Sequence, residues 1–404
     1  MYRLDLGPLG LDRGGHILLE RALAPLPVGG HLAVTGRDPA LPVHLRAWAR
    51  RRGHRFVDPP GEAAGGSGPG HGGGEALVVV RGDADERRWA GARRAGEAGR
   101  PASRADPAWG LAARGALVEA GGPPLPGADL DRRDVIWSEQ AGRLYAQAAA
   151  NQWDPATVVD WARPDLPDDV EAAVVQTMTY LVENEQAALM VPARFLGRIH
   201  PHFREAVAFL ATQVADEARH VEVFTRRAGL SGGPPGVSGA GGRASLQSLL
   251  DEPDWANASF LLSVLGEGSF LALLSFLERH GPDPVTSRLA RVVLADEARH
   301  VAFAMGHLSE HVTRRPSERD RLRAALERRH DALATTAGLA PAVHDSLVVL
   351  AAGSWEPSAM ASGWDAVAAL QAEMDMGRRR RLVHLGFDDR QAAELSELHT
   401  RNFM

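Results

Sequence analysis

Hydrophobic positions recur with helical spacing through much of the second half of this chain. Between residues 170 and 311 they predict four long helices: Val170–Arg198, Pro201–Ala228, Ser245–Arg279 and Pro284–His311. Gly, Pro and Ser cluster between the second and third (Gly229–Gly242), where a four-helix bundle needs its long crossover. A further helix is expected from Val135 to Gln152. We therefore predict a helical bundle over residues 135–315.

The first 60 residues show a different pattern, in which short apolar runs alternate with amphipathic ones. They predict a small β-α-β-α-β domain with these elements in order: strand Tyr2–Leu6, helix Gly15–Ala24, strand His31–Thr35, helix Pro42–Arg52 and strand His54–Val57. The expected fold class is thus α+β, mainly α, with a small N-terminal α/β domain.

Two other regions complete the predicted organisation. Residues 61–134 are expected to hold a Gly-rich linker (Gly61–Gly74), a strand (Glu75–Arg81), a helix (Arg87–Gly99) and the irregular segment Pro101–Gly127. Residues 316–404 are expected to form extra C-terminal helices, with breaks near Gly338–Pro341 and Ser354–Gly363. The arginine run Arg378–Arg381 is expected to be a solvated helix face.

Composition excludes several classes of function. The chain has no cysteine, so thiolate metal sites and sulfur nucleophiles are excluded. A net charge of −6 argues against a nucleic-acid partner. The N-terminus has no apolar signal segment, and no membrane-spanning run is evident, so a cytoplasmic location without membrane partners is expected.

One pentapeptide, Asp-Glu-Ala-Arg-His, occurs twice, at Asp216–His220 and Asp296–His300. In each copy a Glu and a His lie three residues apart and therefore share one face of a helix. A single Glu-x-x-His pair is usually a solvated or salt-bridged pair. Two copies, on two helices that each have a Glu-bearing partner helix, favour a metal site instead.

The apolar stripes of the four helices show which acids face inward. Glu185 interrupts the stripe of the first helix, whereas Glu183 lies off it. The other three stripes are interrupted in the same way, by Glu217 and His220, by Glu267, and by Glu297 and His300. Six such groups on buried faces would be costly without a compensating cation.

The spacing of these acids provides an independent argument. Glu185 and Glu217 are 32 residues apart, and their midpoint falls at Pro201 in a predicted turn. Glu267 and Glu297 are 30 apart, and their midpoint falls at Pro282 in another. Antiparallel neighbours would therefore bring each pair of acids to the same height in the bundle.

These residues resemble the ferritin-like di-metal carboxylate superfamily over about residues 135–311. The resemblance implies that Glu185, Glu217 and His220 hold one metal and that Glu267, Glu297 and His300 hold the other. Glu217 and Glu297 would bridge the two metals and take part in catalysis. The implied cofactor is two iron ions, with manganese as the alternative because ligand preferences overlap, and dioxygen as co-substrate.

The same resemblance gives roles to the remaining residues of the repeat. A metal-bound His donates its other N–H to a carboxylate, so Asp296 would orient His220 and Asp216 would orient His300. Arg219 and Arg299 would neutralise these acids. Trp137, Trp153 and Trp161 lead into the bundle and are expected to pack in its core, with a place as aromatic covers over the metal pocket as the alternative. His200 and His202 are expected on a surface loop.

Two comparisons within the superfamily narrow the activity. Ribonucleotide-reductase-like radical generators carry a tyrosine one turn after the first metal-binding His, where this chain has Phe224, with Ala304 at the equivalent place after His300. Arylamine N-oxygenases add a His where this chain has Val293. Neither activity is therefore supported.

The predicted function is a dioxygen-activating di-iron oxidase or oxygenase that acts on a small organic substrate. An external electron donor is implied, and a homodimer is one expected assembly. The expected lining of the substrate pocket is Phe224, Phe260, Phe270, Leu271, Phe303 and His307, although His307 has a bundle-end structural role as its alternative. Two other functions remain open: a non-enzymatic iron-binding or ferroxidase protein, and a metal-free scaffold.

The N-terminal pattern resembles the TusA-like sulfur-carrier fold. The matching features include Leu4-Asp5-Leu6, Pro27-Val28-Gly29-Gly30 and Arg52-Gly53-His54. Where that family has its persulfide cysteine, this chain has Leu11, so sulfur transfer is chemically excluded. A scaffold, dimerisation or docking module and a ligand-binding module both remain open for this domain.

Overall fold

The structure, a computed structural model, describes residues 2–57, 76–334 and 341–403. It divides into two compact units, one comprising residues 1–94 with 117–122 and the other residues 95–116 with 123–404. The chain is mainly helical with a small sheet, as the sequence predicts. The predicted linker Gly61–Gly74 lies outside the described residues.

The first unit is an α/β domain. Its elements are β1 (Tyr2–Asp5), α1 (Gly15–Leu23), β2 (His31–Thr35), α2 (Leu41–Arg51), β3 (Arg55–Val57) and β4 (Leu77–Val80), with a 3₁₀ turn at Leu11–Arg13. The sheet order is β1-β2-β4-β3, and β1 and β2 run parallel while β4 is antiparallel to both of its neighbours. Because β4 lies inside the sheet, the domain extends past the boundary at residue 60 that the sequence pattern suggested.

The helix predicted at Arg87–Gly99 is wrong. Helix α3 (Ala84–Arg88) ends early, and β5 (Arg93–Arg94) pairs with β6 (Leu117–Val118). Gly91 and Gly96 adopt φ values of 77° and 70°, which an α-helix does not accommodate. Turn geometry therefore overrides the helical spacing in this segment.

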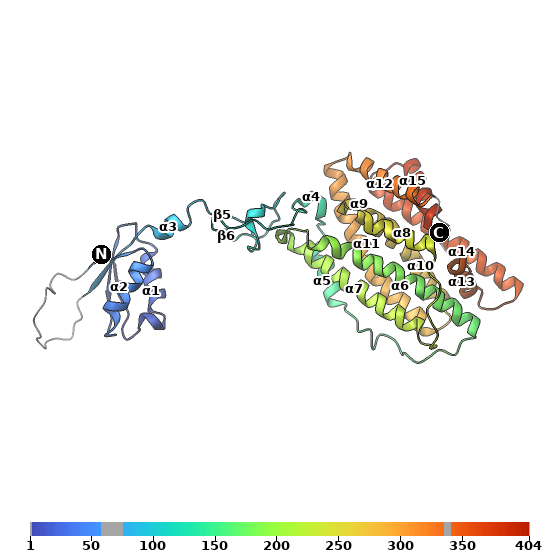
Figure 1. The fold of residues 1–404 in the computed structure, drawn as a ribbon, viewed down its shortest axis with the longest axis horizontal. Helices are drawn as coiled ribbons and strands as arrows, with labels where there is room; N and C mark the ends of the chain where they lie inside the picture. Colours follow the sequence, from blue (N-terminus) through green and yellow to red (C-terminus); the bar gives the residue numbers. More distant parts are fainter. Residues whose placement is uncertain (1, 58–75, 335–340, 404) are drawn as a thin grey trace, which may run out of the picture. The chain divides into compact units, whose positions relative to one another are not determined.

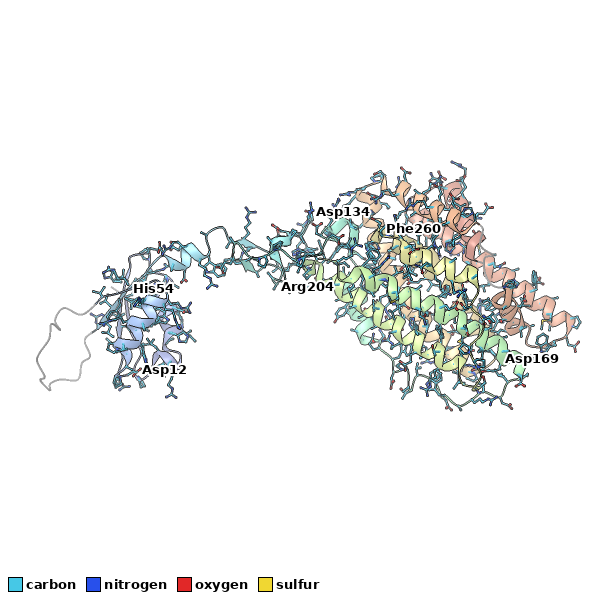
Figure 2. All side chains as sticks on the ribbon, in the orientation of Figure 1. Asp12, His54, Asp134, Asp169, Arg204 and Phe260 are labelled. Carbon is cyan, nitrogen blue, oxygen red and sulfur yellow. The ribbon has the colours of Figure 1, made fainter. Side chains whose placement is uncertain are left out.

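The second unit contains a four-helix bundle (Figure 1). Its helices are α6 (Asp168–Leu196), α7 (Arg204–Ala228), a composite third segment and α11 (Pro284–Arg314). The third segment joins α9 (Trp255–Ser259), the π-helix η4 (Phe260–Glu267) and α10 (Gly268–His280). Figure 2 shows side chains filling the space among these helices, with Phe260 on the third segment.

The third predicted helix, Ser245–Arg279, is divided in the structure. Helix α8 (Ala240–Asp251) belongs to the crossover, and the bundle segment begins only at Trp255. Pro253 disfavours helical geometry at Glu252, which is extended (φ −70°, ψ 113°). Asp254 then caps α9 by accepting a hydrogen bond from the Asn257 N–H. The helix predicted from Val135 is divided similarly, into α4 (Arg133–Ile136) and α5 (Ala141–Ala150).

C-terminal helices cover one side of the bundle (Figure 1). They are α12 (Glu318–Leu333), α13 (Pro341–Ala352), α14 (Pro357–His384) and α15 (Asp389–Phe403). Helix α13 packs on α6, and α14 packs on α10. The expectation of a solvated Arg378–Arg381 face is wrong in part, because Arg378 is buried and hydrogen-bonds Ser396 and Ser269.

Among the residues that the structure describes, one helical run has the length and apolar character of a membrane span. It is Trp255–His280, and 78% of its most apolar stretch is buried within the protein. This is the third segment of the bundle.

A buried ion-pair network ties one end of the bundle together. The guanidinium of Arg227 is fully buried and donates to both carboxylate oxygens of Glu171, at 2.8 and 2.9 Å. It also donates to Asp283 at 2.9 Å, and Asp283 caps α11 by accepting from the Thr286 N–H. Arg227 therefore joins α6, α7 and the start of α11.

We expect Arg227→Met to lower the free energy of unfolding by about 3–5 kcal/mol, because it leaves two buried carboxylates without their cation. Urea denaturation followed by circular dichroism measures this. The matched control is Arg288→Met, which removes an exposed arginine of α11 and should cost less than about 0.5 kcal/mol. Equal losses in the two variants would show that the network contributes nothing.

The expectation that His200 and His202 lie on a surface loop is wrong, since both are almost fully buried. His202 Nε2 accepts a hydrogen bond from the Ala102 N–H at 2.9 Å, which requires a neutral ring. Burial, assisted by the nearby charge of Arg114, lowers the pKa of His202 to about 4. The unfolded chain therefore binds a proton here at a higher pH than the folded chain does.

This difference predicts that stability declines as pH falls from about 6.5 towards 4, because protonation favours the unfolded chain in that window. His202→Gln keeps an acceptor for the Ala102 N–H but cannot be protonated. We expect the variant to show a shallower pH dependence of its urea midpoint between pH 6.5 and 4. An unchanged slope would contradict this assignment.

Candidate metal centre

Six ionisable side chains meet in one buried layer of the bundle. Glu185 comes from α6, Glu217 and His220 from α7, Glu267 from the end of η4, and Glu297 and His300 from α11. Each of the six is no more than 5% exposed. The structure therefore brings together all six residues of the predicted ligand set, and it places Glu183 outside it.

The layer lies between two hydrophobic clusters. On α7, Leu210 belongs to one cluster and Phe224 to the other, with Glu217 between them. On α11, Val293 and Phe303 bracket Glu297 and His300 in the same way. Water is thus kept from the layer on both sides, which raises the cost of any uncompensated charge.

Two overlapping groups within this layer have the geometry of metal sites. One is Glu185, Glu217, His220 and Glu297, and the other is Glu217, Glu267, Glu297 and His300. In each group the ligand atoms lie within 4.8 Å of one another. Glu217 and Glu297 belong to both groups, so each can offer one oxygen to each side.

The imidazoles are oriented by contacts on both ring nitrogens. His220 Nδ1 faces the acids, 3.0 Å from Glu217 and 3.3 Å from Glu297, and His300 Nδ1 lies 3.0 Å from Glu217. On the opposite side, His220 Nε2 lies 3.2 Å from Asp296, and His300 Nε2 lies 3.3 Å from Asp216. These crossed His–Asp contacts are as expected. They hold a proton on Nε2 and leave Nδ1 as the lone-pair donor.

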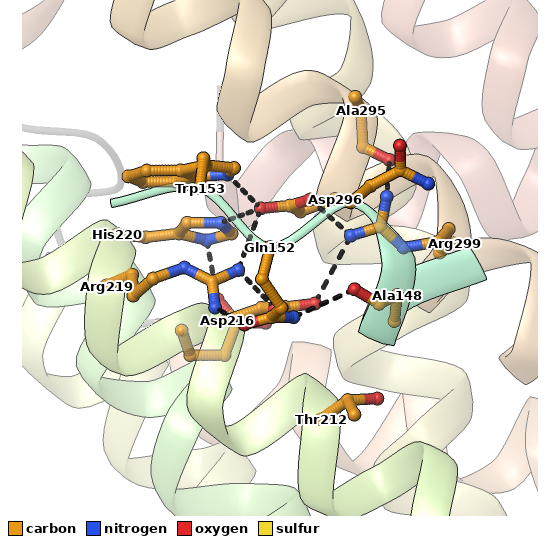
Figure 3. Close-up of polar contacts among 12 residues, drawn as sticks. Ala148, Gln152, Trp153, Thr212, Asp216, Arg219, His220, Ala295, Asp296 and Arg299 are labelled. Atoms are coloured by element: carbon orange, nitrogen blue, oxygen red, sulfur yellow. Dashed lines mark hydrogen bonds and ion pairs between the residues drawn. The ribbon is translucent and has the colours of Figure 1, made fainter. Parts of the chain in front are cut away.

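Arginines balance the two aspartates (Figure 3). Arg219 donates to Asp216 at 2.5 Å and lies 3.4 Å from Asp296, while Arg299 pairs with Asp296 and lies 3.4 Å from Asp216. Burial would raise the pKa of Asp296, but the hydrogen bond from His220 and the charge of Arg299 hold it at about 2. Asp296 therefore remains a carboxylate that can accept from the imidazole.

Trp153 belongs to this network, whereas the sequence favoured packing in the bundle core for it. Its indole N–H donates to Asp296 at 2.8 Å, and its ring stacks on His220 with centroids 6.2 Å apart. The guanidinium of Arg219 lies 4.9 Å from the centre of the indole. The preceding Gln152 donates to Asp216 at 3.3 Å. No helical stripe reports these residues, because both lie in the loop after α5.

Several buried carboxylate oxygens in this layer have no hydrogen-bond donor in the described part of the chain, which is what a cation site requires. Among the described residues, no donor satisfies Glu185 Oε1, Glu267 Oε2 or either carboxylate oxygen of Glu297. Burial, and then the charge of Glu217, raises the pKa of Glu185 well above its ordinary value; burial and the charge of Glu297 do the same for Glu267. Two divalent cations would remove both penalties, so the donor set fits iron or manganese.

A narrow cavity of about 50 Å³ reaches this layer. Its lining includes Glu185, Glu267 and Glu297 of this layer, together with Arg329 and His399. The rest is largely apolar: Ala188, Leu246, Leu249, Leu261, Leu262, Phe270 and Leu273. Of the substrate-pocket residues expected from the sequence, Phe270 lines this cavity. Phe224, Phe260 and Phe303 lie in the hydrophobic clusters instead, and Leu271 is not part of the lining.

His307 has a structural role in this arrangement. Its Nε2 lies 2.7 Å from the Ser259 hydroxyl, and its Nδ1 lies 3.1 Å from the Val135 carbonyl oxygen. Burial lowers its pKa to about 3, so the ring is neutral. These contacts match the bundle-end alternative, and His307 does not line the cavity that reaches the acids.

Comparison with known proteins gives a limited result. No protein-family model matches the chain, and no curated protein matches it. Among solved structures, it is similar to an R2-like ligand-binding oxidase with an aerobically reconstituted metal cofactor after photoconversion, with a TM-score of 0.41 and 18% identity. A variant of such an oxidase with an anaerobically reconstituted Mn/Fe cofactor gives a TM-score of 0.42 and 18% identity. Each match covers 67% of this chain and 95% of the other. A likeness this weak establishes neither family nor activity.

Metal stoichiometry should follow the two overlapping groups. We expect two metals per chain in the unaltered protein, one in Glu185→Ala or Glu267→Ala, and none bound tightly in Glu217→Ala, which removes an oxygen from both sites. Anaerobic equilibrium dialysis with Fe²⁺ measures this. Glu183→Ala, which alters an acid outside the layer, is the control and should keep both metals. Loss of a metal in the control alone would overturn the assignment of Glu185.

The indole N–H of Trp153 should matter for metal affinity. Trp153→Phe keeps the ring over His220 but removes the donor to Asp296, so we expect about tenfold weaker binding of one metal. Isothermal titration with Mn²⁺ measures the change. Trp161→Phe also removes an indole donor, one that bonds the Pro155 carbonyl instead, and should leave both affinities unchanged. Equal effects of the two substitutions would contradict a specific role for Trp153.

Proposed function

We propose that this protein is a dioxygen-activating oxidase or oxygenase of the ferritin-like di-metal carboxylate superfamily. Two iron ions, or manganese in their place, would be held by Glu185, Glu217, His220, Glu267, Glu297 and His300. The observation that carries the proposal is the sharing of Glu217 and Glu297 by two ligand groups in a buried layer. A single-metal site would not need two acids placed between two imidazoles.

The bound metal pair would supply the electrons for reduction of dioxygen. The side chains of this protein would hold the metals, keep the imidazoles oriented and exclude water. Glu217 and Glu297 lie within reach of both imidazoles and can change their contacts as the charge of the layer changes. Asp216 and Asp296 keep the His protons on Nε2, and the two hydrophobic clusters exclude water from the reacting groups.

The lining of the cavity favours an enzyme that acts on a small organic substrate over an iron-storage protein. Its lining includes Glu185, Glu267 and Glu297 of the acid layer, and five leucines and Phe270 are among its other lining residues. An apolar group could thus be placed beside the metals while water remains excluded. The electron donor would be an external partner, because no redox group other than the metals is implied by the described residues.

The N-terminal unit has a separate proposed role. Its strand and helix order is compatible with the proposed TusA-like fold, and Leu11, at the position of the carrier cysteine, is buried in its core. We propose that the unit docks a partner or a second copy of the chain, with ligand binding as the alternative. A cytoplasmic location is part of the same proposal.

Iron-loaded protein should consume dioxygen when a reductant is supplied, and should do so catalytically once its substrate is present. Filling the cavity with Ala188→Leu should reduce oxidation of an apolar substrate at least tenfold, because Ala188 lines the cavity beside Glu185. An oxygen electrode, with product analysis over a panel of small apolar compounds, measures both quantities.

The same variant separates an organic oxidase from a ferroxidase. Oxidation of Fe²⁺ without organic substrate should be little changed by Ala188→Leu, since the ligands are intact. Turnover that is limited to Fe²⁺, with no organic compound oxidised by either protein, would favour the iron-binding alternative. Fewer than one bound metal per chain, with no response to dioxygen, would contradict the enzyme proposal and favour a metal-free scaffold.

A further inference from the structure

The segment that carries Glu267 departs from α-helical geometry. Phe260–Glu267 is a π-helix, and Glu267 is its last residue. The Gly268 N–H reaches back five residues to the Ser263 carbonyl, and its other partners are the Leu265 and Gly266 carbonyls. In an α-helix it would donate to Val264 instead. Short π-helical turns cost stability and commonly occur at functional sites.

A side chain from the C-terminal extension bonds this turn. Arg381 of α14 donates from Nε to the Val264 carbonyl at 2.7 Å, three residues before Glu267. This is the carbonyl that the α-helical pattern would have paired with Gly268. Burial lowers the pKa of Arg381 to about 10, which leaves the guanidinium charged at neutral pH.

A second residue of α14 contacts the same region, where the π-helix η4 meets α10. Arg378 NH1 donates to the Ser269 hydroxyl at 3.2 Å, and that hydroxyl donates to the Leu265 carbonyl at 2.7 Å. Arg381 thus bonds the Val264 carbonyl directly, and Arg378 bonds the hydroxyl that donates to the Leu265 carbonyl, so both carbonyls just before the step from π to α geometry are held from α14. The contacts at Val264 and Leu265 lie within one turn of Glu267.

Gly268 makes room for this contact. A Cβ at Gly268 would lie 2.5 Å from both Cζ and Nε of Arg381, closer than such atoms approach. Glycine within a helix costs about 1 kcal/mol relative to alanine, so its use immediately after a proposed ligand has a local cost. The close approach of the guanidinium gives a physical reason for it.

We propose that Arg381 is a positioning residue for the metal centre, which holds the π-helical turn and thereby keeps the Glu267 carboxylate facing the metal pair. This inference rests on the proposed metal site. Without the guanidinium, the Val264 carbonyl loses a charged donor, and the Gly268 N–H becomes its best replacement. Such a change converts the turn to α geometry and rotates Glu267 away from Glu297 and His300.

The test is an anaerobic titration of the full-length, metal-free protein with Co²⁺, by calorimetry and visible absorption. We expect Arg381→Met to bind one cobalt as tightly as the unaltered protein and the second about 10–100-fold more weakly. The spectrum of the singly loaded variant should match that of Glu267→Ala rather than that of Glu185→Ala. A purely structural role for Arg381 would not select one of the two sites.

Three further variants make the result decisive. Arg381→Lys, which keeps a donor, should recover much of the second-site affinity. Arg380→Met, which removes the exposed neighbouring arginine, should bind both metals normally. Gly268→Ala displaces the guanidinium while leaving Arg381 in place, so it should weaken the same site, and combining it with Arg381→Met should add little.

The failure of this inference can be distinguished from failure of the proposed function. If the unaltered protein binds no cobalt in the layer, the metal centre itself is wrong. If it binds two and both Arg381→Met and Gly268→Ala also bind two with unchanged affinities, the metal centre stands and the positioning role is overturned. Should Arg381→Met fail to fold, Gly268→Ala decides by itself, because it retains the arginine and a better helix-forming residue.

Discussion

Buried charge is the constraint on which the second unit depends. Four carboxylates and two imidazoles lie in one layer between two hydrophobic clusters, where unbalanced charge costs several kcal/mol per group. The two imidazoles cannot compensate all four acids, and several acid oxygens have no donor among the described residues. Two divalent cations would balance the layer, and their binding energy would then contribute to the stability of the folded bundle.

Much of the surrounding structure can be understood as support for this layer. The crossed contacts between His220 and Asp296 and between His300 and Asp216 fix the imidazoles. The Asp216 and Asp296 carboxylates are neutralised by arginines from the same repeats. Each pentapeptide therefore supplies a proposed ligand pair to one side of the layer and a positioning pair to the other, which explains why the two copies are identical. Trp153 adds a donor from outside the bundle helices.

The bundle helices and the height of the site could be predicted from the sequence because both follow from local spacing. Helical periodicity and the midpoints at Pro201 and Pro282 depend only on residues near in the chain. The points at which a predicted helix is interrupted were harder to predict. The division at Pro253 and the positive φ of Gly91 come from backbone geometry that an apolar pattern does not report.

Interactions between distant segments were the least predictable part. Burial of Arg378 depends on packing of α14 against α10, 109 residues away at the Ser269 contact. Burial of His202 depends on the loop that carries Ala102, 100 residues earlier. The π-helical turn is a related case, because its Val264 carbonyl accepts a hydrogen bond from Arg381, 117 residues later in the chain. For Arg378 and His202, polarity indicated a surface position, and a hydrogen-bond partner far along the chain made burial favourable instead.

Anomalous X-ray scattering at the iron edge, measured on crystals of the iron-loaded protein, tests the proposed two-metal centre most directly. We expect two peaks per chain about 3.5–4 Å apart, both beside Glu217 and Glu297, with one next to His220 Nδ1 and the other next to His300 Nδ1. An empty acid layer in protein that contains iron elsewhere, or a single peak away from the two shared glutamates, would contradict it.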